Sequence, residues 1–134
     1  MPDIAPVDMF QDVLDFHKKL VPSQVRPLPS WPSYDVMLLR GKLIQEEYQE
    51  LLLAISEPDF AKIVASSLDL VYVLLGLLVA MGVDARPVWQ AIQTANMAKE
   101  GGPMREDGKV LKPEGWTHPS VAHIIADQTN RLDG

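Results

Sequence analysis

Three carboxylates share one side of a helix that the sequence predicts from about residue 33 to residue 55. Glu46 and Glu50 are four residues apart and Glu47 and Glu50 are three apart, so their side chains fall within an arc of about 100°. Like charges at this spacing repel one another, and no Lys or Arg four residues later compensates them. Partly buried carboxylates need a cation, and oxygen ligands suit Mg²⁺ or Mn²⁺. The pattern predicts a metal site, with a solvated acidic face as the alternative.

Asp69 is the one charged residue in a long apolar segment, Ile63 to Val83. Ser66 and Tyr72, three residues before and after it, lie on the same face of the predicted helix. A buried acid needs a partner, which could be a hydrogen bond within the core. The functional interpretation is that Asp69 faces the three glutamates across a helix pair and completes the metal site.

The same apolar segment is about as long as a bilayer is thick. A central Asp opposes membrane insertion, and polar helices are predicted on both sides without a basic flank. A helix that is apolar all round also suits the buried centre of a bundle. We therefore expect no membrane association.

Capping and breaking residues place the other helices. No stretch alternates with a period of two for long enough to form a sheet. Asp107-Gly108 predicts a turn, within either a short hairpin or a loop. The prediction is a single all-α domain over residues 1–134, a bundle of four to five helices with a tail at 101–134. Its helices are expected from Asp8 to about Leu20, from Ser33 or Asp35 to about Ile55, at about 60–81 after Asp59, from Asp84 to about Lys99, and after Pro119.

Composition narrows the classes of function. The net charge of −6 leaves no basic stripe for a nucleic-acid backbone, so a small anionic substrate would need a cation to mediate its binding. The absence of cysteine excludes disulfides, thiolate zinc sites and cysteine nucleophiles. The N-terminus lacks the basic and apolar regions of a signal peptide, so a cytoplasmic location is expected.

In this order, the acidic residues resemble those of the all-α nucleoside triphosphate pyrophosphohydrolase superfamily, and within it the MazG-like branch. Dimeric dUTPases and phosphoribosyl-ATP pyrophosphatase are relatives. The family pattern is Glu-Glu-x-x-Glu on one helix and Glu-x-x-Asp on the next. Glu46-Glu47-x-x-Glu50 and Asp69 match it, as do Ala95-Asn96-Met97-x-Lys99 and the segment from Asp107 to Pro113. The similarity covers roughly residues 10 to 119.

The resemblance implies a chemistry and a set of roles. Mg²⁺ would bridge the phosphates of a nucleoside triphosphate, and hydrolysis at the α-phosphorus would release the monophosphate and pyrophosphate. The tail would close over the nucleotide, and the protein would be a homodimer or homotetramer. The implied metal ligands are Glu46, Glu47, Glu50 and Asp69, with Glu47 and Glu46 catalytic and Asn96, Lys99, Lys109, Lys112 and Tyr72 contacting the substrate.

One position departs from the family pattern. Ser66 stands where the family has the Glu of Glu-x-x-Asp, so the site keeps four carboxylates. Weaker metal binding, or nucleotide binding without hydrolysis, therefore stays open, and with it a regulatory module as an alternative to an enzyme. Phosphoribosyl-ATP pyrophosphatase is the alternative substrate assignment, and a purely structural dimerisation bundle is a third alternative.

Apolar and aromatic residues outside the acidic cluster give further expectations. Leu74, Leu75, Leu77 and Leu78 follow Asp69 and add more apolar surface than four helices can cover, which predicts burial between subunits. Trp31, Trp89 and Trp116 could stack on a base, although such residues more often belong to a core. Arg26 is a further candidate for a phosphate contact.

Overall fold

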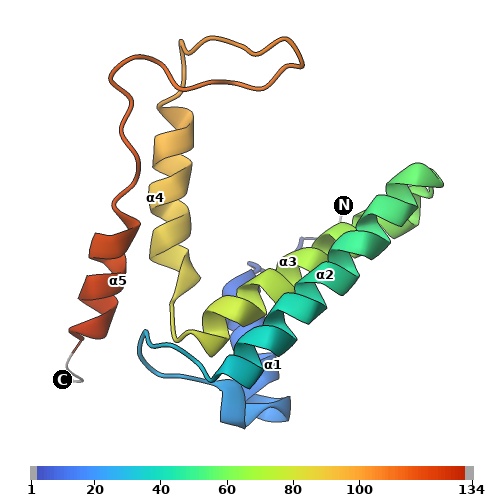
Figure 1. The fold of residues 1–134 in the computed structure, drawn as a ribbon, viewed down its shortest axis with the longest axis vertical. Coiled ribbons are helices and arrows are strands. Elements are labelled where there is room, and N and C mark those ends of the chain that lie inside the picture. The colour runs from blue at the N-terminus through green and yellow to red at the C-terminus, as the bar shows by residue number, and fades with distance from the viewer. Residues whose placement is uncertain (1–2, 132–134) are drawn as a thin grey trace. The chain divides into compact units, whose positions relative to one another are not determined.

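The computed structural model describes residues 3–131 and is helical, which confirms the all-α prediction. It contains five α-helices, and no strand occurs in the described range apart from one isolated bridge. The chain divides into two compact units, Met1–Asp84 and Ala85–Gly134. The elements are α1 (Met9–Leu20), a 3-10 turn η1 (Pro22–Gln24), α2 (Tyr34–Ser56), α3 (Phe60–Ala80), α4 (Ala85–Met97) and α5 (Val121–Thr129) (Figure 1).

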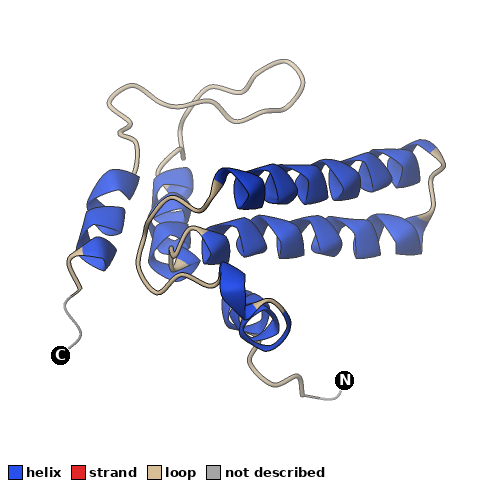
Figure 2. Ribbon diagram, turned by 60° about the horizontal axis from the view of Figure 1, so that its bottom comes forward, coloured by secondary structure: helices blue, strands red, loops and turns tan. Residues whose placement is uncertain are grey.

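The first unit is built on an antiparallel helix pair. Figure 2 shows α2 and α3 side by side, and α1 packs against α3. Each helix begins at the predicted cap, where a side-chain oxygen accepts a hydrogen bond from a backbone N–H three residues later. The capping residues are Asp8, Ser33 and Asp59. These local bonds fix where the helices start.

The proline-rich segment after α1 is attached to the end of α3. The backbone N–H of Ser30 donates to the carbonyl of Met81 at 3.0 Å. Gly82 follows with a φ of 72°, and a Cβ there would clash with the carbonyl of Leu28. Glycine therefore ends α3, as predicted, and also admits the neighbouring loop.

A buried polar group joins the three helices of the first unit. Arg40 of α2 is only 5% exposed and donates from Nη2 to the carbonyl of Val73 in α3 at 2.8 Å. His17 of α1 donates from Nδ1 to the carbonyl of Val13, so Nε2 of the neutral ring can accept from Arg40 Nη1 at 3.4 Å. Burial lowers the pKa of His17 despite the Val13 bond, and the Arg40 charge lowers it further. Gly76 provides the space, because its missing Cβ is where the guanidinium lies.

The second unit contains α4, the tail and α5. The helix α4 ends at Met97, two residues before the predicted end, because tight turns replace helical hydrogen bonds and the N–H groups of Lys99 and Gly102 donate three residues back. The turn at Asp107-Gly108 closes a minimal hairpin with a bridge between Met104 and Val110. The last helix, α5, follows Pro119 as predicted.

Much of the apolar surface of α2 and α3 is exposed. Leu39, Tyr48 and Ile55 of α2 lie at the surface of this chain. The two helices bury only a narrow strip against one another, and small residues such as Ala54 and Ala80 dominate the core. Within one chain, the remaining apolar faces of both helices stay uncovered.

Candidate active site

The register of the α2–α3 pair places the acidic residues. Arg40 contacts α3 at Val73 and Gly76. Moving seven residues along α2, two helical turns, leads to Glu47 on the same face, and moving two turns back along antiparallel α3 leads to the segment from Ser66 to Asp69. Arg40, Glu47 and Ala54 thus follow one line on the face of α2 that meets α3. Glu47 is the carboxylate aimed at the helix interface.

The environment of Glu47 is unfavourable for its charge. The side chain is half-buried, and its Oε2 atom is fully buried without a hydrogen-bond partner in the described part of the chain. Burial raises the pKa of Glu47, and the nearby charges of Glu50, Asp69 and Glu46 raise it further, in that order. A buried anionic oxygen with no donor is what a cation would satisfy. Glu47 could therefore supply one oxygen ligand to the Mg²⁺ that the sequence predicts.

The other three carboxylates reach solvent. Glu46, Glu50 and Asp69 are exposed, which corrects the expectation that Asp69 is partly buried. Their charges act on Glu47, but no three His, Asp or Glu side chains in residues 3–131 are grouped as if around one metal ion. The four-ligand metal set stays a prediction.

Ser66 and Tyr72 occupy different surroundings on α3. Ser66 is 3% exposed. Its small side chain is thus enclosed at the position where the family pattern has Glu. Tyr72 is at the surface, and its ring meets Phe16 of α1 edge to face, with centroids 5.6 Å apart. Tyr72 therefore packs between helices, and its predicted substrate contact is untested.

The remaining predicted substrate contacts lie in the second unit. Asn96 and Lys109 are exposed, and within residues 3–131 neither side chain makes a hydrogen bond or an ion pair. Lys99 and Lys112 come together instead, each with its ammonium group over the ring of Trp116. The structure thus brings two of the four predicted contacts, Lys99 and Lys112, to one aromatic ring.

The structure shows the surroundings of two tryptophans and an arginine outside the acidic cluster. Trp31 and Trp89 are exposed, so neither is a core residue. Arg26 donates from Nε to Ser30 Oγ at 2.6 Å and so braces the proline-rich loop. Trp116 is the functional candidate that sequence reasoning undervalued. The proximity in sequence of Lys112 and the Pro113-to-Trp116 turn was the available signal.

The comparisons with known proteins give the chain its family. The sequence model of phosphoribosyl-ATP pyrophosphohydrolase matches residues 13–96, well over half of the chain. The match contains α2, α3 and all four acidic residues, but it ends before Lys99 and the tail. A search of curated proteins gave no match. The chain belongs to the phosphoribosyl-ATP pyrophosphohydrolase family, a family of hydrolases acting on a nucleotide pyrophosphate bond.

Proposed function

We propose that this chain is a Mg²⁺-dependent nucleoside triphosphate pyrophosphohydrolase of the MazG-like kind, acting in the cytoplasm to clear NTPs or dNTPs, with dUTP among the candidates. The buried, unpartnered Oε2 of Glu47 at the α2–α3 interface carries this proposal. The long apolar α3 and the Asp107-Gly108-Lys109 tail favour a triphosphate over phosphoribosyl-ATP.

Glu47 has the role of general base in this proposal. Mg²⁺, or Mn²⁺, held by Glu46, Glu47, Glu50 and Asp69 would neutralise phosphate charge and lower the pKa of a bound water. The Oε2 atom of Glu47 has no hydrogen-bond donor in the described part of the chain, so it is available to accept a proton. Glu47 takes a proton from the water that attacks the α-phosphorus, the bond from the α-phosphorus to the bridging oxygen breaks, and pyrophosphate leaves. Glu46 helps to orient that water.

A panel of substrates tests the reaction. The purified chain with Mg²⁺ is incubated with ribo- and deoxynucleoside triphosphates, including dUTP, and with phosphoribosyl-ATP, and the products are separated. We expect monophosphate and pyrophosphate from at least one triphosphate. Diphosphate and phosphate would contradict the assigned bond. Exclusive turnover of phosphoribosyl-ATP would instead establish the second candidate, which the matched family favours.

A regulatory module that binds nucleotide without hydrolysis is favoured by one observation, the enclosed Ser66. Under that alternative the panel gives no turnover although nucleotide binds in the presence of Mg²⁺. A gain of hydrolysis in Ser66→Glu would then identify the missing carboxylate as the cause.

The apolar face of α3 supports a homodimer or homotetramer. The helix Phe60–Ala80 is long and apolar enough to cross a membrane, yet little of it is buried within the chain. Val64 and Leu68, one turn apart, are 51% and 56% exposed. A second copy of the same face would cover them, and the exposed Asp69 on this helix disfavours lipid as the covering.

We expect Leu68→Lys to reduce the mass of the particle in solution, because a charge in an apolar interface is unpaired. Sedimentation velocity measures this, with Trp31→Lys as a control for adding a charge at an exposed aromatic that is not part of α3. A wild-type monomer, or an oligomer unaffected by Leu68→Lys, would contradict the α3 interface.

A further inference from the structure

His17 is a buried histidine that makes a contact with each of its ring nitrogens. It is 2% exposed and lies on α1, beside Arg40 of α2 and Gly76 of α3. Its Nδ1 donates to the carbonyl of Val13 at 2.8 Å, so the single proton of the neutral ring is on Nδ1. Its Nε2 is therefore an acceptor, and Nη1 of Arg40 lies 3.4 Å from it. This contact requires an uncharged ring.

A second proton on the His17 ring would have no partner. Protonated Nε2 is a donor, and it would face the donating Nη1 of a side chain that keeps its charge at physiological pH. Arg40 is held in place, because its Nη2 donates to the carbonyl of Val73 and only 5% of the residue is exposed. Water therefore screens little of the repulsion between the two cations.

Arg40 is the charged residue that acts on the His17 ring. On α3, the titratable ring of Tyr72 meets Phe16 edge to face, and Gly76 adjoins His17. The turn η1 consists of Pro22, Ser23 and Gln24, none of which titrates. The acidic and basic residues of α1 are exposed, so water screens their charges: Asp12, Asp15, Lys18 and Lys19.

The helix α1 can leave the α2–α3 pair without unfolding it. Apart from His17, α1 buries Phe10 and Val13, whereas α2 and α3 pack against each other. The proline-rich segment after α1 stays attached to α3 through the bond from Ser30 to Met81. A helix at the end of a chain opens at a lower cost than the whole fold. Release of α1 would carry His17 into water and away from Arg40.

We propose that His17 and Arg40 form a pH-sensitive latch, which holds α1 on the α2–α3 pair while His17 is neutral and releases α1 when Nε2 takes up a proton. In the released state His17 is an exposed histidine with a pKa of about 6.5, whereas burial and Arg40 lower the pKa of His17 in the closed state. The released state thus binds more protons, and acid favours it. This inference holds whichever nucleotide the chain hydrolyses.

Amide hydrogen exchange of the full chain, followed residue by residue by NMR, tests the latch. It is measured from about pH 7.5 to about pH 5 and corrected for the intrinsic exchange rate at each pH. The 12 residues of α1 form too short a helix to persist alone in water, so release removes their protection. We expect protection in α1 to fall by up to about tenfold per pH unit below about pH 6.5, the slope for one proton, while α2 and α3 keep theirs.

Three variants identify the group that takes up the proton. His17→Gln keeps a donor and an acceptor but does not titrate, so α1 should stay protected throughout. His123→Gln changes an exposed histidine of α5 and should retain the wild-type pH dependence. Arg40→Met keeps His17 and removes the second cation, so release should begin at a lower pH, which tests the latch even if His17→Gln fails to fold. Glu47 is present in every variant, so its own titration cancels.

Three results would overturn the latch. One is the same loss of α1 protection in His17→Gln as in the wild type, and another is wild-type protection that does not change with pH. The third is an equal loss in α1, α2 and α3, since that is acid unfolding of the whole unit. Full wild-type pH dependence in Arg40→Met would exclude Arg40 as the second group of the latch.

Discussion

Glu47→Gln is expected to reduce the hydrolysis rate of the preferred triphosphate about a thousandfold, within the range for losing a general base. The amide has the same shape as the carboxylate but cannot accept the proton of the attacking water. It also lacks the charge that a divalent cation requires. Steady-state turnover of the best substrate in the panel measures the loss.

The same substitution is expected to stabilise the metal-free protein. Glu47 ionises less readily in the folded chain than in the unfolded chain, because burial and the charges of Glu50, Asp69 and Glu46 raise its pKa. A raised carboxyl pKa means that ionised Glu47 opposes folding once the pH exceeds its unfolded pKa. Removing the charge should therefore increase the free energy of unfolding at neutral pH and raise the Tm.

The dependence of the Tm on pH and on Mg²⁺ tests whether the charge of Glu47 causes this change in stability. The difference in Tm between Glu47→Gln and the wild type should vanish in acid, where Glu47 is protonated in both the folded and the unfolded chain. It should grow as the pH rises from the pKa of Glu47 in the unfolded chain to its higher pKa in the folded chain. Mg²⁺ should raise the Tm of the wild type and leave Glu47→Gln nearly unchanged. Glu106→Gln, which removes an exposed carboxylate from the tail, should alter neither turnover nor Tm. Turnover within tenfold of the wild type would exclude Glu47 as the base.

Local chemistry explains why the helices could be predicted from sequence. Asp8, Ser33 and Asp59 each bond to an N–H three residues away, so the information that starts a helix lies within one turn of it. The side of α2 that carries the glutamates follows from helical periodicity alone. The end of α4 was less well predicted, because consecutive turns compete with the last helical bonds there.

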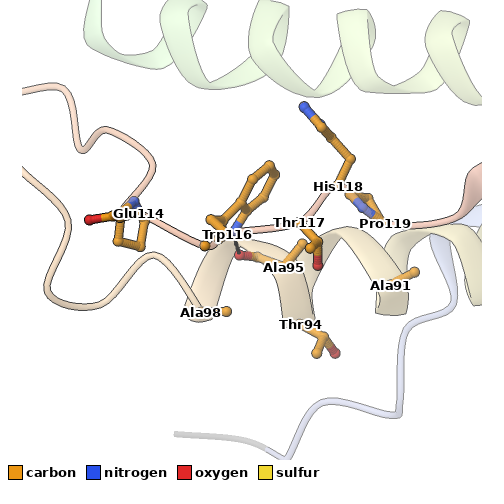
Figure 3. Close-up of a pocket in the computed structure, with 11 residues that line it drawn as sticks. Ala91, Thr94, Ala95, Ala98, Glu114, Trp116, Thr117, His118 and Pro119 are labelled. Atoms are coloured by element: carbon orange, nitrogen blue, oxygen red, sulfur yellow. Dashed lines mark hydrogen bonds between the residues drawn. The ribbon is translucent and has the colours of Figure 1, made fainter.

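Contacts between residues far apart in sequence explain what could not be predicted. Arg40 reads as a surface residue in the sequence, yet its partners are 23 residues before it and 33 residues after it. The position of Glu47 at the helix interface depends on that register, whereas the exposure of Asp69 depends on how little of α3 one chain covers. The orientation of Trp116 likewise depends on a bond to Ala95, 21 residues before it (Figure 3). Helical periodicity predicts which residues share one face of a helix, but it does not predict which other segment packs against that face.

Gly76→Ala is expected to destabilise the protein by roughly 2–4 kcal/mol, the range for overpacking that also breaks a buried hydrogen bond. An alanine Cβ would overlap the guanidinium of Arg40 and crowd the ring of His17 at 3.1 Å. Arg40 would have to give up its hydrogen bond to the carbonyl of Val73. Because the side chain is buried, its charge cannot reach solvent instead. Urea denaturation followed by circular dichroism, at one protein concentration, measures the change.

Gly41→Ala is the matched control, because it makes the same change inside α2 where nothing lies within 4 Å of the new Cβ. Glycine is disfavoured inside a helix, so this variant should gain about 0.5–1 kcal/mol. The two substitutions should therefore have opposite signs. Arg40→Met in the Gly76→Ala background should recover much of the lost stability, since the flexible thioether can give way to the new methyl group. A stabilising Gly76→Ala would mean that Arg40 does not occupy the space beside Gly76, and the α2–α3 register that places Glu47 opposite Asp69 would lose its main support.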